Sequence, residues 1–74
     1  MNPTKEAVID YIKTYPKKHA LGYSNYEITC ICKHFHYHTN RLFDKLLAYP
    51  CTVMSNGDLI HYEDDVIQAF VELL

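Results

Sequence analysis

Five potential metal ligands occupy every second position between residues 30 and 38. They are Cys30, Cys32, His34, His36 and His38. Thiolate and imidazole are the donors that zinc prefers, so this segment is a candidate metal site. On a strand all five side chains would share one face, whereas on a helix only the pairs Cys30/His34 and Cys32/His36 become neighbours. We take Cys30, Cys32, His34 and His36 as the candidate ligands. The simpler interpretation, which we prefer, makes Cys32 a buried apolar residue and the histidines surface groups, with no cofactor.

The next residues have the chemistry to recognise DNA bases. Asn40 can pair with adenine and Arg41 with guanine, each through two hydrogen bonds. Lys33 and Lys45 could neutralise phosphates on either side of them. The full candidate DNA-binding set is Lys33, His36, Tyr37, His38, Asn40, Arg41, Lys45 and Asn56. The alternative is that these residues form an ordinary solvated helix face.

Catalysis is not expected. The chain has no glycine-rich phosphate loop, and its serines fall at a predicted helix start (Ser24) and a predicted turn (Ser55). A pair such as Cys30 and His34 could act as nucleophile and base, but a chain of 74 residues offers little room for a substrate cleft. We therefore predict that the protein is not an enzyme.

The charge is unevenly distributed along the chain. The net charge is −2, yet residues 1–50 carry all seven Lys and Arg against four acids, and residues 51–74 carry five acids and no Lys or Arg. A balance of +3 in the first part is modest for a nucleic-acid-binding protein, whose affinity comes largely from phosphate neutralisation. Asp44 and Asp58 would repel DNA. Charge is therefore the main argument for a protein partner instead of DNA.

Apolar periodicity predicts four helices that position these residues. We expect them at about residues 3–15, 25–35, 37–49 and from 63 or 64 to the end. Asn2 and Pro3 resemble a helix start, and Ser24 with Glu27 forms a capping box. The apolar stripe of the last helix is Val66, Ile67, Phe70, Val71 and Leu74. Because such a stripe needs cover, it predicts either a core helix or a homodimer formed through this helix.

A hairpin is predicted between the third and fourth helices. Asn56-Gly57 suits a two-residue type I′ turn, since both residues tolerate positive φ. That turn would pair Val53 with Ile60 and Cys51 with Tyr62, and place this apolar face on the helices. Met54 and Leu59 would share the opposite face. Residues 20–22 could add a short strand beside the hairpin.

The block Glu27-Ile28-Thr29, Cys32, Arg41-Leu42-Phe43 and Leu46-Leu47 resembles the winged helix-turn-helix superfamily. The resemblance implies an α+β fold for residues 1–74 as a single domain: three helices, a two-stranded hairpin wing and an extra C-terminal helix. It also implies that the helix at about residues 37–49 enters the major groove of double-stranded DNA. A glycine is usual in the turn between the second and third helices, and this chain has Lys33-His34-Phe35-His36 there.

Two narrower resemblances concern parts of the same segment. Residues 40–46 look similar to the recognition helix of domains that bind left-handed DNA, although Asp44 stands where that family has Tyr and the chain has no Trp. Residues 27–32 are similar to the thiolate site of arsenic-repressor-type metal sensors, with the cysteine pair one residue later. These resemblances leave a metal-responsive regulator as a third possibility.

Together these features predict a small DNA-binding transcriptional regulator of phage or mobile-element type. The main alternative is a winged-helix protein that inhibits a larger protein complex, such as a phage-encoded anti-CRISPR or anti-host factor. We expect a cytoplasmic protein, because no apolar run of membrane-spanning length and no signal peptide is evident and three cysteines suggest reduced thiols.

Overall fold

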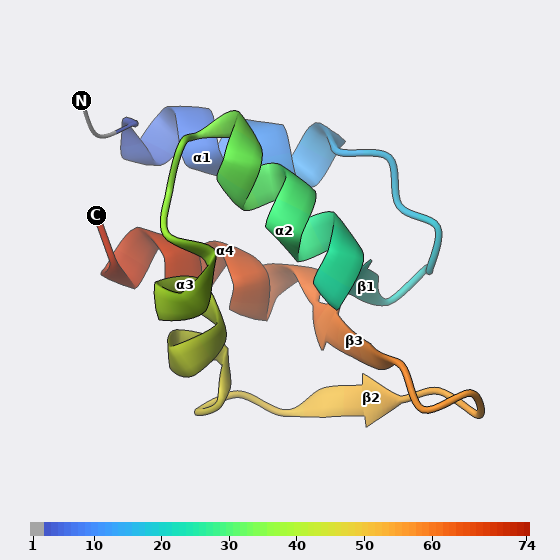
Figure 1. Ribbon diagram of the computed structural model, residues 1–74. Helices are drawn as coiled ribbons and strands as arrows, with labels where there is room; N and C mark the ends of the chain where they lie inside the picture. Colours follow the sequence, from blue (N-terminus) through green and yellow to red (C-terminus); the bar gives the residue numbers. More distant parts are fainter. Residues whose placement is uncertain (1–2) are drawn as a thin grey trace.

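Four helices and three short strands form an α+β arrangement in the described residues (Figure 1). The computed structural model describes residues 3–74, which form α1 (Lys5–Thr14), β1 (Gly22–Ser24), α2 (Asn25–His34), α3 (Thr39–Leu46), β2 (Cys51–Val53), β3 (Leu59–Tyr62) and α4 (Glu63–Glu72). The strands make one antiparallel sheet in the order β1-β3-β2. The predicted α+β class is confirmed. The additional strand also exists, but it begins at Gly22 instead of ending there. No helix in residues 3–74 has the length and apolar character needed to cross a membrane.

Side chains that bond to backbone amides fix the starts of α1 and α2. Ser24 Oγ accepts from the Glu27 amide at 3.3 Å and Glu27 Oε1 accepts from the Ser24 amide at 3.0 Å, which confirms the predicted capping box. The predicted start of α1 was wrong: Thr4 is the N-cap and its Oγ1 accepts from the Ala7 amide at 3.1 Å. Asn2, the predicted cap, lies outside the described residues.

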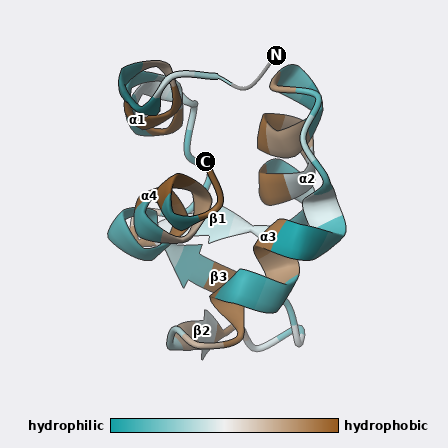
Figure 2. Ribbon diagram, turned by 90° about the vertical axis from the view of Figure 1, so that its left-hand side faces the viewer, coloured by the Kyte–Doolittle hydropathy of each residue, from teal (hydrophilic) through white to brown (hydrophobic). Residues whose placement is uncertain are grey.

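All four helices contribute to the hydrophobic core, together with Tyr23 of β1. The buried apolar side chains of the core are Val8, Ile12, Tyr23, Ile28, Ile31, Cys32, Leu42, Leu46, Val66, Ala69 and Phe70. Figure 2 shows hydrophobic and hydrophilic stretches alternating along the helices, as expected when one side of each helix is covered. The Tyr23 hydroxyl donates to the Ile12 carbonyl and so ties β1 to α1.

The apolar stripe of α4 is covered within the chain. Val66 and Phe70 are fully buried, and α4 packs against both α1 and α3. Only Leu74, at 40% exposure, remains a large exposed apolar side chain of that stripe. The stripe therefore does not require a second copy of the chain, and the reason given for a dimer through this helix no longer applies.

The turn before α3 makes this helix shorter than predicted. The Tyr37 amide donates to the Cys32 carbonyl at 2.9 Å and the His36 amide to the Lys33 carbonyl at 3.1 Å, which is a Schellman motif at the end of α2. His36 has φ +53°, the left-handed conformation usual for Gly in this motif. Residues 36–38 are thus turn and cap residues instead of the first residues of α3. At the other end, the amides of Ala48 and Tyr49 bond to carbonyls three residues back, so the chain tightens before Pro50.

The hairpin exists, but its predicted register was wrong by one residue. The Gly57 amide donates to the Met54 carbonyl and the Met54 amide to the Asp58 carbonyl, so three residues and not two form the loop. Gly57 alone among the loop residues has positive φ, +91°. This is the turn with a left-handed Gly that makes three-residue hairpins. Val53 consequently pairs with Leu59, and Cys51 with His61.

The shift in register exchanges the two faces of β3 relative to β2. His61, not Ile60, faces the helices: its Nε2 lies 2.8 Å from Asn25 Oδ1 of α2, and its ring lies 6.4 Å from that of Phe43 of α3. Ile60 is buried on the other face, beside Leu21 and Met54. The prediction that Met54 and Leu59 share a face was also wrong.

Candidate nucleic-acid interface

The outward face of α3 presents the predicted base-reading residues. Leu42 and Leu46 are buried and fix the orientation of the helix, because they lie at i and i+4 on its inner side. Asn40, Arg41 and Asp44 are exposed on the outer side, and Lys45 is half-buried beside them. The sequence therefore identified the exposed polar face of this helix correctly.

The beginning of α3 carries unsatisfied amides and a shallow hollow. The N-cap, His38, makes no side-chain hydrogen bond to the helix, and the first turn contains no acidic residue. The amides of the first residues of any helix lack carbonyl partners within it, and the helix dipole adds partial positive charge there. An open hollow of about 630 Å³ lies over this end, lined by residues 37–41. This end of α3 is therefore suited to an anionic group.

The candidates in the turn before α3 have different environments. His36 and His38 are exposed, as is Lys33 in the last turn of α2. Tyr37 is half-buried: its ring lies 5.1 Å from that of Phe70, and its hydroxyl donates to the Leu73 carbonyl at 2.7 Å. Tyr37 thus connects the turn to the end of α4. The Tyr37 ring packs inside the fold, whereas the adjacent His36 and His38 are exposed.

Tyr49, which follows α3, also contacts α4. Its hydroxyl donates to Glu72 Oε1 at 2.7 Å, and this hydrogen bond is the main reason that the pKa of Tyr49 is raised. The two tyrosines therefore attach the segments before and after α3 to the C-terminal helix. This role positions α3 and does not add to its exposed face.

The tip of the hairpin presents an acidic group together with Asn56. The Asn56 Oδ1 accepts from the Asp58 amide at 2.9 Å, and its Nδ2 donates to Asp58 Oδ2 at 3.1 Å. The side-chain amide of Asn56 is therefore already hydrogen-bonded, and the Asp58 carboxylate makes the charge at the tip negative. A tip of this kind would not attract a phosphate backbone, in contrast to what its predicted role in DNA binding requires.

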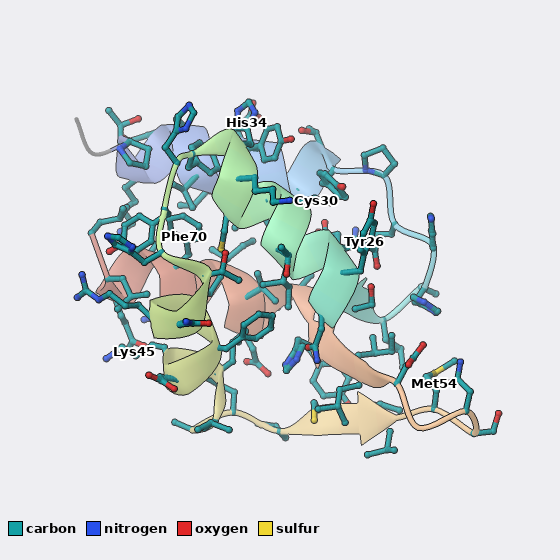
Figure 3. The ribbon with its side chains drawn as sticks, in the orientation of Figure 1. Tyr26, Cys30, His34, Lys45, Met54 and Phe70 are labelled. Carbon is teal, nitrogen blue, oxygen red and sulfur yellow. The ribbon has the colours of Figure 1, made fainter. Side chains whose placement is uncertain are left out.

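The cysteine and histidine segment does not converge on a metal site. No group of three or more His, Cys, Asp or Glu side chains in residues 3–74 is placed to hold a metal ion. Cys32 is fully buried in the core, and burial raises the pKa of its thiol. The ring of His34 stacks on Tyr11 with a centroid distance of 3.8 Å, and Figure 3 shows it at the end of α2 beside α1. His36 is exposed in the turn. The candidate ligand set is therefore distributed over three environments.

His61 is a residue of chemical interest that the sequence did not identify. It is 6% exposed, its Nε2 bonds to Asn25, and its Nδ1 is buried without a hydrogen-bond partner among the described residues. Burial lowers the pKa of His61 below that of an ordinary histidine. With the predicted register, this side chain would have been on the outer face. The length of the hairpin loop decides the position of His61, and the Asn56-Gly57 pair is compatible with loops of two and of three residues.

Comparison with known proteins gives no relative for this chain: no protein-family model, no curated protein and no solved structure matches it. The site must therefore be interpreted from its own geometry.

Proposed function

We propose that the chain is a winged helix-turn-helix domain that binds double-stranded DNA and acts in transcriptional control. The element order α1-β1-α2-α3-β2-β3, with a sheet in the order β1-β3-β2, supports the fold assignment. In this interpretation α2 and α3 form the helix-turn-helix, the β2–β3 hairpin is the wing, and α4 is an addition that covers the core.

The observation that carries the proposal is the exposed beginning of α3. Asn40 and Arg41 lie in its first turn, where a helix entering the major groove brings its side chains to the base edges. Arg41 is suited to guanine and Asn40 to adenine. Lys33 and Lys45 flank these residues and would contact phosphates, which positions the helix without reading sequence.

The small number of cations on this face sets the expected salt dependence. Two lysines, Lys33 and Lys45, can each neutralise about one phosphate, which gives a slope of log affinity against log salt of about −1.8. Raising the salt fourfold should then weaken binding about 12-fold. Asp44 and Asp58 keep the non-specific part weak, so most of the affinity must come from base contacts.

Selection of bound duplexes from a random-sequence library tests the proposal. Fluorescence anisotropy then measures the affinity for the enriched site. Asn40→Ala and Arg41→Ala should each remove the preference at one base pair, a loss of about 1–3 kcal/mol. Lys45→Ala should instead weaken all sequences alike and reduce the slope by about 0.9. Lys13→Ala, an exposed lysine of α1, is the matched control and should change neither quantity. Absence of any enriched sequence at low salt would contradict the proposal.

A second candidate function is binding of another protein, as in an inhibitor of a larger complex. Two large apolar side chains favour it: Leu47 at the end of α3 is 84% exposed, and Val53 of β2 is 65% exposed. Exposed apolar groups together with Asp44 and Asp58 suit a protein surface better than DNA. Leu47→Ser should abolish such binding and leave DNA affinity unchanged, so this variant separates the two functions.

A further inference from the structure

A buried carboxylate with one free oxygen lies at the start of α2. Glu27 is only 3% exposed, and its Oε1 accepts from the amide and hydroxyl of Ser24 at 3.0 and 3.1 Å. Its Oε2 is buried and has no hydrogen-bond partner among the described residues. A buried carboxylate oxygen without a donor is unfavourable, because it has given up its hydration without replacement. The capping box therefore explains one oxygen of Glu27 and leaves the other unexplained.

This carboxylate borders a small cavity with aromatic walls. The cavity measures about 310 Å³ and is lined by Tyr15, Pro16, Lys18, Tyr26 and Glu27. Tyr15 is half-buried at the end of α1, whereas Tyr26 is 73% exposed and projects from the end of α2 nearest β1 (Figure 3). An exposed tyrosine in this position contributes nothing to the core, so its ring is free to cover a bound group.

The cations nearest to the cavity do not neutralise Glu27. Lys17 is engaged elsewhere, since its Nζ lies 2.8 Å from Glu63 Oε2 and 5.7 Å from the centre of the Tyr23 ring. Lys18 contributes to the cavity wall, but no ion pair joins it to Glu27 in residues 3–74. Burial is the main cause of the raised pKa of Tyr15 and of Tyr23, the latter to about 12, and the negative charge of Glu27 makes a smaller contribution to both.

We propose that this cavity binds an organic cation, namely a protonated amine or a guanidinium group. Tyr15 and Tyr26 place two aromatic rings in the cavity wall, and the negative face of an aromatic ring attracts ammonium and methylated ammonium groups. The negative charge of the Glu27 carboxylate supplies the counter-charge, while its Oε1 remains in the capping box. The volume lies at the lower end of the range for ligand pockets, which suits a small headgroup. The site lies at α1 and the start of α2, away from the exposed face of α3, and does not depend on the proposed DNA binding.

The probes for a test are methylguanidinium and tetramethylammonium chloride, with urea as the uncharged analogue of the guanidinium. The full chain is titrated with each probe, and NMR monitors the chemical shifts of the Glu27 amide and of the Tyr15 and Tyr26 rings. The two cations should change these chemical shifts saturably, with a Kd of about 1 mM. Urea should give no such change. Shifts that do not saturate, or equal shifts with urea, would overturn the proposal.

Two variants localise the binding. Glu27→Gln keeps an acceptor for the capping box and removes the charge, so the helix start should remain while affinity falls at least about tenfold. Tyr26→Ala removes an exposed wall without touching the core and should weaken binding about threefold. Glu72→Gln, which neutralises an exposed carboxylate of α4, is the matched control and should bind like the unmodified chain. Unchanged affinity in both Glu27→Gln and Tyr26→Ala would place any binding elsewhere and refute the site.

The same titration distinguishes a small molecule from a protein side chain as the source of the cation. Free methylguanidinium is compared with the same group in a short peptide that contains one arginine and has both ends blocked. Similar affinities indicate a small organic cation. Affinity at least about tenfold higher for the peptide indicates an arginine of a partner protein, because the flanking backbone then adds contacts.

Discussion

Replacing His36 by Gly should stabilise the fold. His36 is the residue that reverses the chain between α2 and α3, and it holds φ +53° with its side chain exposed. Both Schellman hydrogen bonds, from the His36 and Tyr37 amides, depend on that conformation. Nothing in the bonds requires an imidazole, because they involve only the backbone. His36→Gly therefore removes conformational strain and keeps every interaction that ends α2.

The expected gain can be worked from two opposing terms. A non-glycine residue in the left-handed region costs about 1–2 kcal/mol relative to its preferred conformations. Gly recovers this amount but loses about 0.4–1 kcal/mol, because the unfolded chain becomes more flexible. The difference is a stabilisation of about 0.5–1 kcal/mol, which corresponds to a rise in Tm of about 2–8 °C for a domain of this size.

Urea denaturation and thermal unfolding of His36→Gly measure this gain directly. The matched control is His38→Gly: the same exposed residue type two positions later, but with φ −74°. The control should be neutral or slightly destabilising, because Gly relieves no strain there. If His36→Gly were no more stable than His38→Gly, the left-handed conformation of His36 would not be the strained element that we infer.

Three further predictions concern groups that hold the helices and the sheet together. Burial lowers the pKa of His61, so the unfolded chain takes up a proton more readily than the folded one; stability should be complete above about pH 6.5 and decline as the pH falls toward the folded-state pKa. His61→Gln, which can still donate to Asn25 and does not titrate, should flatten that decline when unfolding is followed between about pH 7.5 and pH 5. Gly22→Ala should destabilise the fold by about 2–3 kcal/mol in urea, because the new Cβ would lie 1.9 Å from the His61 carbonyl oxygen of β3; a neutral result would contradict the close approach of the two strands. Tyr37→Phe should cost about 1 kcal/mol through the lost hydrogen bond to Leu73, with Tyr26→Phe, an exposed tyrosine, as the neutral comparison.

Local signals were sufficient to predict that four helices form and to identify most of their buried residues. The capping box at Ser24 and Glu27 is a short-range pattern, since its two partners are three residues apart and need no tertiary contact. The stripe of α2 and the inner residues Leu42 and Leu46 of α3 follow from helical periodicity in the same way. The exposure of Asn40 and Arg41 then follows by geometry. This part of the candidate site was predictable because one helix determines it.

The two turns were not predictable to the same degree. The sequence predicted a longer α3 because residues 36–38 include neither Gly nor Pro. Tertiary contacts of Tyr37 hold this segment as a turn: its ring packs on Phe70, and its hydroxyl bonds to the Leu73 carbonyl near the other end of the chain. At the hairpin, Asn-Gly suits a two-residue loop and also suits the last two positions of a three-residue loop. Choosing between them requires knowing which face of β3 meets the helices.

The chemistry of the molecule depends on that choice more than on any motif. A two-residue loop would have directed Ile60 toward the helices and His61 to the outside, where a histidine titrates like any other. The observed loop instead places an imidazole between the start of α2, through Asn25, and α3, through Phe43. A titratable group thus lies where the sheet meets both helices of the proposed helix-turn-helix.

Protonation of His61 would place a charge beside Phe43, and Asn25 already occupies Nε2, so the buried Nδ1 would gain a proton with no acceptor among the described residues. Acid should therefore loosen the contact between sheet and helices before it affects the core around Phe70, and the amide signals of β3 should broaden earlier than those of α4.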